Sequence, residues 1–485
     1  MSRWMCGRQI MLSLKRAITA RTTRVDPDTA IRIAEQGRRN FKIGVVNGVL
    51  AGILDPLSGI FVLTLFLTRL DAPAFLVGLL PTIASCGGLL PQLIVAGKLR
   101  GKKRVMPWYT GASVFRVMGM AGMAASAWLI PLGRDMALVS LFASFMLYMF
   151  SSGVSGLPFM EVVAKIVPPH RKGTFFGFRQ FGSAILGMVT SAVAGAVMSE
   201  QLGLVFPYNF AMMLTVATVA GAVVFGLWSL VREPDLEQAH VANPGTGSIF
   251  RHGATALQTN RDYRLLATVR LLATFAGIAG PFYLVYAAKE LQVPVGILAL
   301  YLTMQTAIPL AMGLLWVPLA NKAPRRKLVL ITASLQMAVP VTAVIVGIVA
   351  GIVPAGWHAY IVAPIFIAGS VATSAAVMFN DVVLLSIAPP AERPVYFGFL
   401  NTLAGVASFT LPLGGLLLEM LGYTPLFMLS GALALCSLLA GLGIERPARE
   451  RRNTARQVVS KARARGRLML SVPMQSVQQL FQREQ

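Results

Sequence analysis

Charged residues are scarce in this sequence. Asp, Glu, Lys and Arg make up 13% of its 485 residues, whereas soluble domains usually carry about 25%. This shortage excludes an ordinary soluble protein. In their place the chain has 55% hydrophobic residues and a mean hydropathy of +0.67. Apolar runs of about 20 residues recur from end to end, and each is long enough to cross the roughly 30 Å hydrocarbon core of a bilayer as a helix.

Residues that bind metals or form disulfides are also few. The three cysteines, Cys6, Cys86 and Cys436, lie far apart, which excludes a disulfide framework, a zinc site and an iron–sulfur site. The four histidines form no ligand pair, and no phosphate-binding loop of the Gly-x-x-x-x-Gly-Lys-Ser/Thr kind is present. We therefore expect no metal and no cofactor. Because no nucleophile arrangement or His/Asp/Glu cluster is present either, we do not expect an enzyme.

The formal net charge of +24 raises the question of nucleic acid. The basic residues lie between the apolar spans rather than in one soluble segment, so no nucleic-acid partner is expected. Anionic lipid headgroups and the excess of Lys and Arg in cytoplasmic loops account for the charge more simply.

Hydropathy predicts an all-α membrane protein with twelve transmembrane helices. The predicted spans are 43–67, 75–97, 105–131, 136–160, 174–198, 208–230, 265–288, 296–320, 327–350, 358–380, 395–418 and 425–444. They predict five regions: a basic N-terminal segment (1–42), a six-helix bundle (43–230), a linker (231–264), a second bundle (265–444) and a basic tail (445–485).

The loops predict the orientation. The segments 98–104, 170–172, 232–264 and 325–327 are basic and fall on one side, together with both termini. The opposite loops hold only Arg69, Arg134 and Lys289, each close to an acid. This bias predicts an inner-membrane protein with both termini in the cytoplasm.

The two halves of the chain resemble each other. Ala96–Val105 corresponds to Ala320–Val329 at an offset of 224 residues, and Pro168–Phe178 corresponds to Pro389–Phe399 at an offset of 221 residues. Asp55-Pro56 in span one has a counterpart in Gly280-Pro281 of span seven. A duplicated unit of six helices, with both copies starting on the same side, gives parallel repeats related by an axis along the membrane normal.

Over residues 40–445 this duplication resembles the major facilitator superfamily. The resemblance rests on the short basic loops after spans two and eight, the loops after spans four and ten, and the central linker. It implies two homologous six-helix bundles and a monomeric secondary transporter that moves a small solute by alternating access. The loop after span two departs from the family's Gly-x-x-x-Asp-Arg-x-Gly-Arg-Arg pattern, because its acidic position falls on Gly97 or a neighbour, and on Asn321 in the second half.

Two ionisable residues lie deep within predicted spans. Asp55 is about 18 Å into span one and Arg116 about 16 Å into span three, where a charge costs about 2.5–3.5 kcal/mol on insertion scales. In one interpretation Asp55 responds to protons or cations, and Arg116 tunes it or binds an anionic group. In the other the two residues form a static ion pair within the bundle.

Further candidates follow from the spans that line the cavity in the resembling family. The polar candidates are Asn47, Tyr148, Ser151, Ser152, Ser155, Tyr283, Tyr286, Gln305 and Thr373, with Arg179 and Asn401 in the inner half. The gating-loop candidates are Lys98, Arg171, Lys172, Lys322, Arg326, Glu161 and Asp381. Each polar residue has the alternative role of an interhelical hydrogen bond. Arg270 is expected to extend along its own stem to the interface.

The expected function is secondary transport driven by an ion gradient, with protons as the first choice. The candidates suit a small amphipathic or drug-like solute, while a sugar or an organic acid stays open. The antiporter signature Gly-Pro-x-x-Gly-Gly is absent from span five. The stretch where it is expected, Ala184–Thr190, has a different sequence. The alternative is a transporter-like assembly factor or sensor without solute flux.

Overall fold

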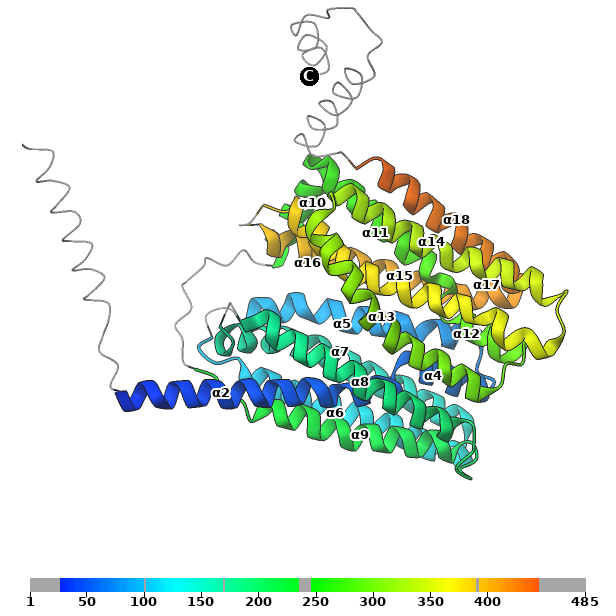
Figure 1. Cartoon of the computed structure of the whole chain (residues 1–485), viewed down its shortest axis with the longest axis horizontal. Helices are drawn as coiled ribbons and strands as arrows, with labels where there is room; N and C mark the ends of the chain where they lie inside the picture. The colour runs from blue at the N-terminus through cyan, green and yellow to red at the C-terminus, as the bar shows by residue number, and fades with distance from the viewer. Residues whose placement is uncertain (1–26, 100–101, 169–170, 235–245, 390–391, 445–485) are drawn as a thin grey trace, which may run out of the picture.

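The computed structural model describes residues 27–99, 102–168, 171–234, 246–389 and 392–444. The predicted N-terminal segment up to residue 26 and the basic tail from 445 lie outside the described residues. The regular elements of the described part are all helices. Figure 1 shows them as two bundles side by side, α2–α9 below and α11–α18 above.

The first bundle contains six spans. Span one is built from α2 (Pro27–Leu50), η1 (Ala51–Ile53), α3 (Leu54–Ser58) and α4 (Ile60–Arg69). The others are α5 (Ala74–Leu99), α6 (Met106–Trp128), α7 (Arg134–Ile166), α8 (Lys172–Met198) and α9 (Tyr208–Ser229), with the short η2 (Ile130–Leu132) between α6 and α7.

The second bundle repeats this plan after α10 (Thr246–Thr259). Its first span is α11 (Arg261–Ala276), η4 (Gly277–Ala279), α12 (Phe282–Val285) and the π-helical η5 (Tyr286–Glu290). It continues with α13 (Val295–Lys322), α14 (Arg325–Ala350), η6 (Ala355–Trp357) and α15 (His358–Ile387). Span eleven is α16 (Arg393–Ala407), η7 (Ser408–Thr410) and α17 (Leu413–Leu421), and span twelve is α18 (Tyr423–Leu442).

The prediction of an all-α fold with twelve membrane helices is confirmed. Eleven helices of the described part are long and apolar enough to cross a membrane by length and composition. The twelfth, α6, has the length but is diluted by Arg116 and several small or polar residues. The structure adds α10, which lies within the predicted linker and packs on α16, where the ring of Phe250 meets that of Phe399 at 5.8 Å.

Three spans are interrupted at corresponding or symmetric positions. Span one breaks at Gly59, just after Asp55-Pro56, and span seven becomes a 3₁₀ turn at Gly277–Ala279, just before Pro281. Span eleven has the same turn at Ser408–Thr410, before Pro412. A proline removes one backbone donor and crowds the preceding turn, so a helix bends or changes pitch there. The match between spans one and seven agrees with the internal repeat.

Hydrogen bonds join the two bundles at one end of the molecule, which we call the closed face. There Lys289 Nζ lies 2.7 Å from Asp71 Oδ1 and the Ala74 amide donates to Glu419 Oε1 at 2.9 Å. Deeper in, Thr82 Oγ1 donates to the Ser408 carbonyl at 2.8 Å. In Figure 1 the labels of α4, α12 and α17 mark this end at the right.

Glycines allow the close approach of the bundles near the closed face. A Cβ on Gly415 would lie 2.3 Å from the backbone of Ala74, and one on Gly195 would lie 2.4 Å from the Ala299 side chain. Both distances are far below van der Waals contact. The segment around Pro412 is therefore packed against the other bundle in this structure.

The opposite end carries the loops 102–104, 167–168, 232–234 and 388–389, and we call it the linker face. Here Glu233, which follows α9, accepts from the amides of Val105 and Met106 at 2.9 and 2.8 Å and pairs with Lys165 at 2.6 Å. A carboxylate at a helix N-terminus is favourable because the first amides lack partners. Glu233 thus places an acid at the start of α6, where segment 98–104 has none.

Candidate functional site

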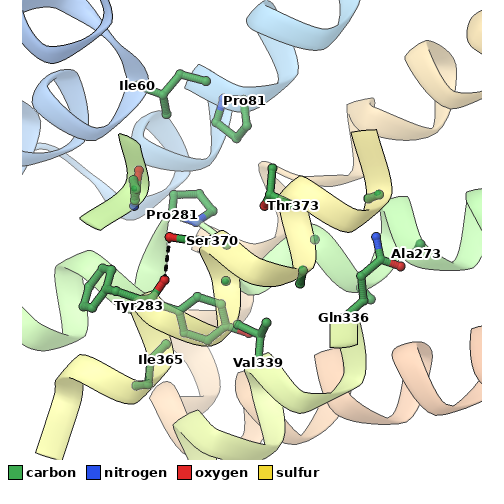
Figure 2. A pocket seen from close by; sticks show the side chains of 18 of the residues that line it. Ile60, Pro81, Ala273, Pro281, Tyr283, Gln336, Val339, Ile365, Ser370 and Thr373 are labelled. Carbon is green, nitrogen blue, oxygen red and sulfur yellow. Dashed lines mark hydrogen bonds between the residues drawn. The ribbon is translucent and has the colours of Figure 1, made fainter. Parts of the chain in front are cut away.

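A cavity of about 800 Å³ lies within the second bundle and is closed on one side by the first. Its walls come from α11, α12, α13, α14, α15 and α18, while Ile60 and Phe61 of α4 and Pro81 of α5 complete it. Figure 2 shows Tyr283, Gln336 and Thr373 around this space, each from a different helix. Because both bundles form its walls, relative motion of the bundles would change its shape.

One end of the cavity is charged. Arg270 of α11 and Asp381 of α15 both line it and interact electrostatically. Among the described residues they form no direct ion pair. The Arg270 Nη2 donates to Asn401 Oδ1 at 2.9 Å, whereas its Nη1 is shielded from solvent and has no hydrogen-bond partner in the structure.

A second, smaller cavity of about 160 Å³ adjoins the charged end. Arg270, Gln336 and Asn380 line both cavities, and Thr274 and Thr332 line the smaller one. The two threonine hydroxyls donate to helix carbonyls four residues earlier. The amides of Gln336 and Asn380 make no hydrogen bond within the described part of the chain, so they are available to a ligand.

The opposite end of the cavity is apolar and aromatic. The ring of Phe61 from the first bundle meets that of Phe366 from α15 edge-on at 6.3 Å, and Phe366 stacks on Tyr301 at 4.6 Å. Phe366 and Asp381 are fifteen residues apart on one helix, which corresponds to about 22 Å at 1.5 Å per residue. The cavity is therefore elongated, with charge at one end and aromatic rings at the other.

The first bundle holds a related arginine in a different setting. Arg179 of α8 donates to Asn47 Oδ1 at 2.9 Å and to the Gly44 carbonyl. Its guanidinium lies over three aromatic rings, 5.0 Å from Phe159, 5.4 Å from Phe175 and 5.6 Å from Trp228. Arginine over aromatic faces is favourable when shielded from water. Arg179 thus lies among packed side chains of its own bundle.

The structure does not bring Asp55 and Arg116 together. The Arg116 guanidinium lies 3.7 Å from the Phe225 ring and 5.6 Å from the Tyr148 ring, and its Nη1 is 3.5 Å from Ser155 Oγ. It faces α7 and α9 rather than span one. Depth along two helices does not fix which way their side chains point, so the pair expected from the sequence is absent.

Asp55 has a different environment from the one expected. Within the described residues its carboxylate has no hydrogen-bond or ion-pair partner. Close packing with α8 falls instead on the neighbouring Gly52, where a Cβ would lie 2.1 Å from the Ser183 carbonyl. Asp55 is therefore a carboxylate halfway along a membrane span without a cation beside it.

The other sequence candidates divide into three groups. Tyr283, Gln305, Thr373 and Asp381 line the cavity. Asn47, Tyr148, Ser151, Ser152, Ser155, Arg179, Tyr286 and Asn401 do not line it, and several of them make contacts within one bundle. Lys98, Arg171 and Lys322 are exposed, and Lys172, Arg326 and Glu161 are half-buried, at the ends of helices on the linker face.

Three cavity residues were missed or misjudged from the sequence. Arg270 was expected to reach the interface, but this expectation was wrong: Asn401 holds its guanidinium inside the bundle. Gln336 and Asn380 were not selected. A polar residue in the middle of an apolar span is a signal that could have found Gln336, and the neighbouring Asp381 could have pointed to Asn380.

Comparison with known proteins agrees with this geometry. Residues 265–481 match the family described as the Major Facilitator Superfamily. The chain is similar to the nucleoside transporter NupG, with 12% identity and a TM-score of 0.64 over 84% of this chain and 99% of that one. It is also similar to an inward-facing bacterial homologue of the iron transporter ferroportin, with 12% identity and a TM-score of 0.63 over 83% and 98% of the two chains.

The xylose transporter XylE from E. coli, in an inward-open conformation, gives 13% identity and a TM-score of 0.61 over 84% of this chain and 96% of that one. Comparison with curated proteins gives no match. At these identities the structural likeness concerns the fold. The chain is a membrane protein with the major facilitator fold, and the resemblance to that superfamily is confirmed.

Proposed function

We propose that this protein is a secondary active transporter that moves a small solute across the membrane by alternating access. The observation that carries the proposal is the cavity shared by the two bundles, with Phe61 on one side and Phe366 on the other. The contacts at the closed face and the named transporters of the same fold support it.

The conformation in hand is assigned to the inward-facing state. The positive segments 102–104 and 325–327 lie at the linker face, and their charge favours the cytoplasmic side of the inner membrane. The closed face, with the Asp71–Lys289 ion pair, then faces outward. Solute would leave the cavity toward the cytoplasm in this state and enter from the other side after the bundles rock.

Proton coupling is assigned to Asp55. An ion-driven carrier needs a group whose charge changes with the coupling ion, and Asp55 is a carboxylate in mid-span without a cation beside it. Such a group can change its charge by binding one proton. Because Arg116 contacts α7 and α9 instead, it is not needed for this step.

The experiment begins with a thermal-stability screen of purified protein against small solutes, because a bound solute stabilises the fold by mass action. Uptake of a stabilising solute into proteoliposomes is then measured with and without an imposed pH gradient. Asp55→Asn is expected to abolish gradient-driven accumulation while keeping exchange of solute at equal pH. Asp135→Asn, which changes an exposed acid in the first turn of α7, is the matched control.

Two outcomes would overturn parts of the proposal. Accumulation that Asp55→Asn leaves intact would remove Asp55 from coupling without removing transport. The absence of any solute flux, together with a protein partner that co-purifies, would favour an assembly factor or sensor instead.

A further inference from the structure

The charged end of the cavity contains two opposite charges that do not form an ion pair with each other in the described structure. Arg270 and Asp381 attract one another and line the same space, yet they form no direct ion pair in the described structure. A lone anion in this space would be repelled by Asp381, and a lone cation by Arg270. A solute that carries both charges can satisfy both side chains.

The hydrogen-bonding groups favour one placement of the two charges. Arg270, Gln336 and Asn380 lie where the two cavities meet, and all three can donate. Asp381 lines the large cavity but not the smaller one. A carboxylate fits the donors at the junction, since arginine binds carboxylates with two parallel hydrogen bonds, and an ammonium group then meets Asp381.

The remainder of the cavity selects for an apolar body. From the charged end it extends toward the Phe61–Phe366 contact, about 22 Å along α15, past Pro281 and Ile365. Each buried methylene contributes about 0.8 kcal/mol, so a chain that lies along this wall gains affinity with length until it reaches the rings.

We propose that the cavity binds an amphiphilic zwitterion, with its carboxylate at Arg270, Gln336 and Asn380, its ammonium at Asp381 and its apolar chain toward Phe61 and Phe366. This inference gives a substrate class to the transporter function proposed above and rests on it. It concerns binding, so it can fail while transport and its proton coupling stand.

The test uses a series of 2-amino acids with unbranched side chains: 2-aminobutyrate, norleucine and 2-aminooctanoate. Thermal midpoints of the full-length protein in detergent are measured against ligand concentration. Affinity is expected to rise about fourfold for each added methylene, in line with its burial. Octanoate and octylamine, each with one charge, are expected to bind at least tenfold more weakly than 2-aminooctanoate.

Substitutions separate the two charges. Arg270→Gln is expected to abolish the preference for 2-aminooctanoate over octylamine, and Asp381→Asn to abolish the preference over octanoate. Phe366 lies about 22 Å along α15 from Asp381, beyond the reach of an eight-carbon chain, so Phe366→Ala is expected to leave the binding of all three compounds unchanged. Arg264→Gln, on the same helix as Arg270 but exposed and bonded to α10 carbonyls, controls for loss of an arginine.

Three results would overturn the proposal. One is that no member of the series stabilises the wild type; another is that the singly charged compounds bind as well as the zwitterion. The third is that Arg270→Gln and Asp381→Asn fold with wild-type midpoints and retain wild-type selectivity. If another solute is nevertheless transported in proteoliposomes, the transporter function survives and the substrate class does not.

Discussion

The two bundles contain the same arginine–asparagine hydrogen bond with its partners exchanged. In the first bundle the asparagine is on span one (Asn47) and the arginine on span five (Arg179), at 2.9 Å. In the second the arginine is on span seven (Arg270) and the asparagine on span eleven (Asn401), also at 2.9 Å. The paired positions differ by 223 and 222 residues, between the offsets of 221 and 224 seen in the loops.

The surroundings of the two bonds have diverged. Phe159, one of the rings around Arg179, has Asn380 as its counterpart at an offset of 221 residues. Aromatic packing in one half is thus replaced by an amide and a cavity in the other. The hydrogen bond between spans one and five therefore belongs to a packed region of the first bundle. The equivalent bond between spans seven and eleven leaves a guanidinium available to a ligand in the second bundle.

The largest effect should come from removing the packed arginine. Arg179→Gln loses two hydrogen bonds of a charged donor and its contacts with three rings, so the free energy of unfolding should fall by about 3 kcal/mol. Arg270→Gln should cost much less, because Nη1 of Arg270 is buried without a partner. Denaturation midpoints of both variants and of the control Arg264→Gln measure this. Equal losses for Arg179→Gln and Arg270→Gln would contradict the distinction between the bundles.

The sequence predicted much of this fold because hydropathy and loop charge are summed over many residues. The twelve spans, the duplication and the correspondence of Asp55-Pro56 with Gly280-Pro281 are all visible in such patterns. The direction of a single side chain is set by helix rotation and packing, which hydropathy does not report. Hence Arg116 was placed near Asp55 by depth alone, and Arg270 was assigned to the interface although Asn401 retains it.

Only two of the four residues in the exchanged hydrogen bonds could be linked to the inner half of the bundles from the sequence. Arg179 and Asn401 were both selected as candidates in the inner half. Their partners Asn47 and Arg270 lie on other helices, and only the packed structure shows which helices touch. The cavity could not be predicted for the same reason. Its polar walls come from spans nine and ten, where Gln336 and Asn380 are isolated polar residues with no motif around them.

A second prediction concerns the closed face, where the bundles touch instead of standing apart. Gly415→Val should force α17 from the Ala74 backbone and favour the state that is open at this face. Cys86, buried and bonded to the Gly405 carbonyl at 3.2 Å, is a native reporter of that opening. In a background with Cys6 and Cys436 changed to serine, maleimide labelling of Cys86 should accelerate about tenfold, equivalent to about 1.4 kcal/mol.

Gly313→Val serves as the control for this variant, since a Cβ at that position meets nothing within 4 Å. Unchanged labelling of Cys86 in a folded Gly415→Val protein would show that the face opens without separating α17 from α5. That result would place the moving contact elsewhere along the interface.

A third, smaller effect distinguishes the two asparagines. Asn47 is buried and also donates to the Val224 carbonyl at 2.7 Å, so it links three helices. The bond described for the Asn401 side chain is the one to Arg270. Asn401→Ala should therefore lower stability by less than about 1 kcal/mol and weaken 2-aminooctanoate binding about threefold by releasing Arg270. Asn47→Ala should lower stability more and leave that binding unchanged. The reverse pattern would show that the first bundle also supports the ligand.

The smallest effect is expected at the Asp71–Lys289 pair, which joins the bundles but is exposed. The hydrogen bond and positive charge of Lys289 lower the pKa of Asp71 below its usual value of 3.8. The pair therefore stabilises the closed face fully above that value, and the contribution is lost as the pH falls through the lowered pKa. Exposed ion pairs contribute less than about 1 kcal/mol, so Asp71→Asn should raise Cys86 labelling less than fivefold at pH 7, and less in high salt. Wild type and variant should converge once the pH is below the lowered pKa of Asp71, measured with 2,2′-dithiodipyridine, a thiol reagent that still reacts in acid. A difference that persists below that pKa would mean that the Asp71 side chain acts through hydrogen bonds that its neutral form also makes, rather than through its charge.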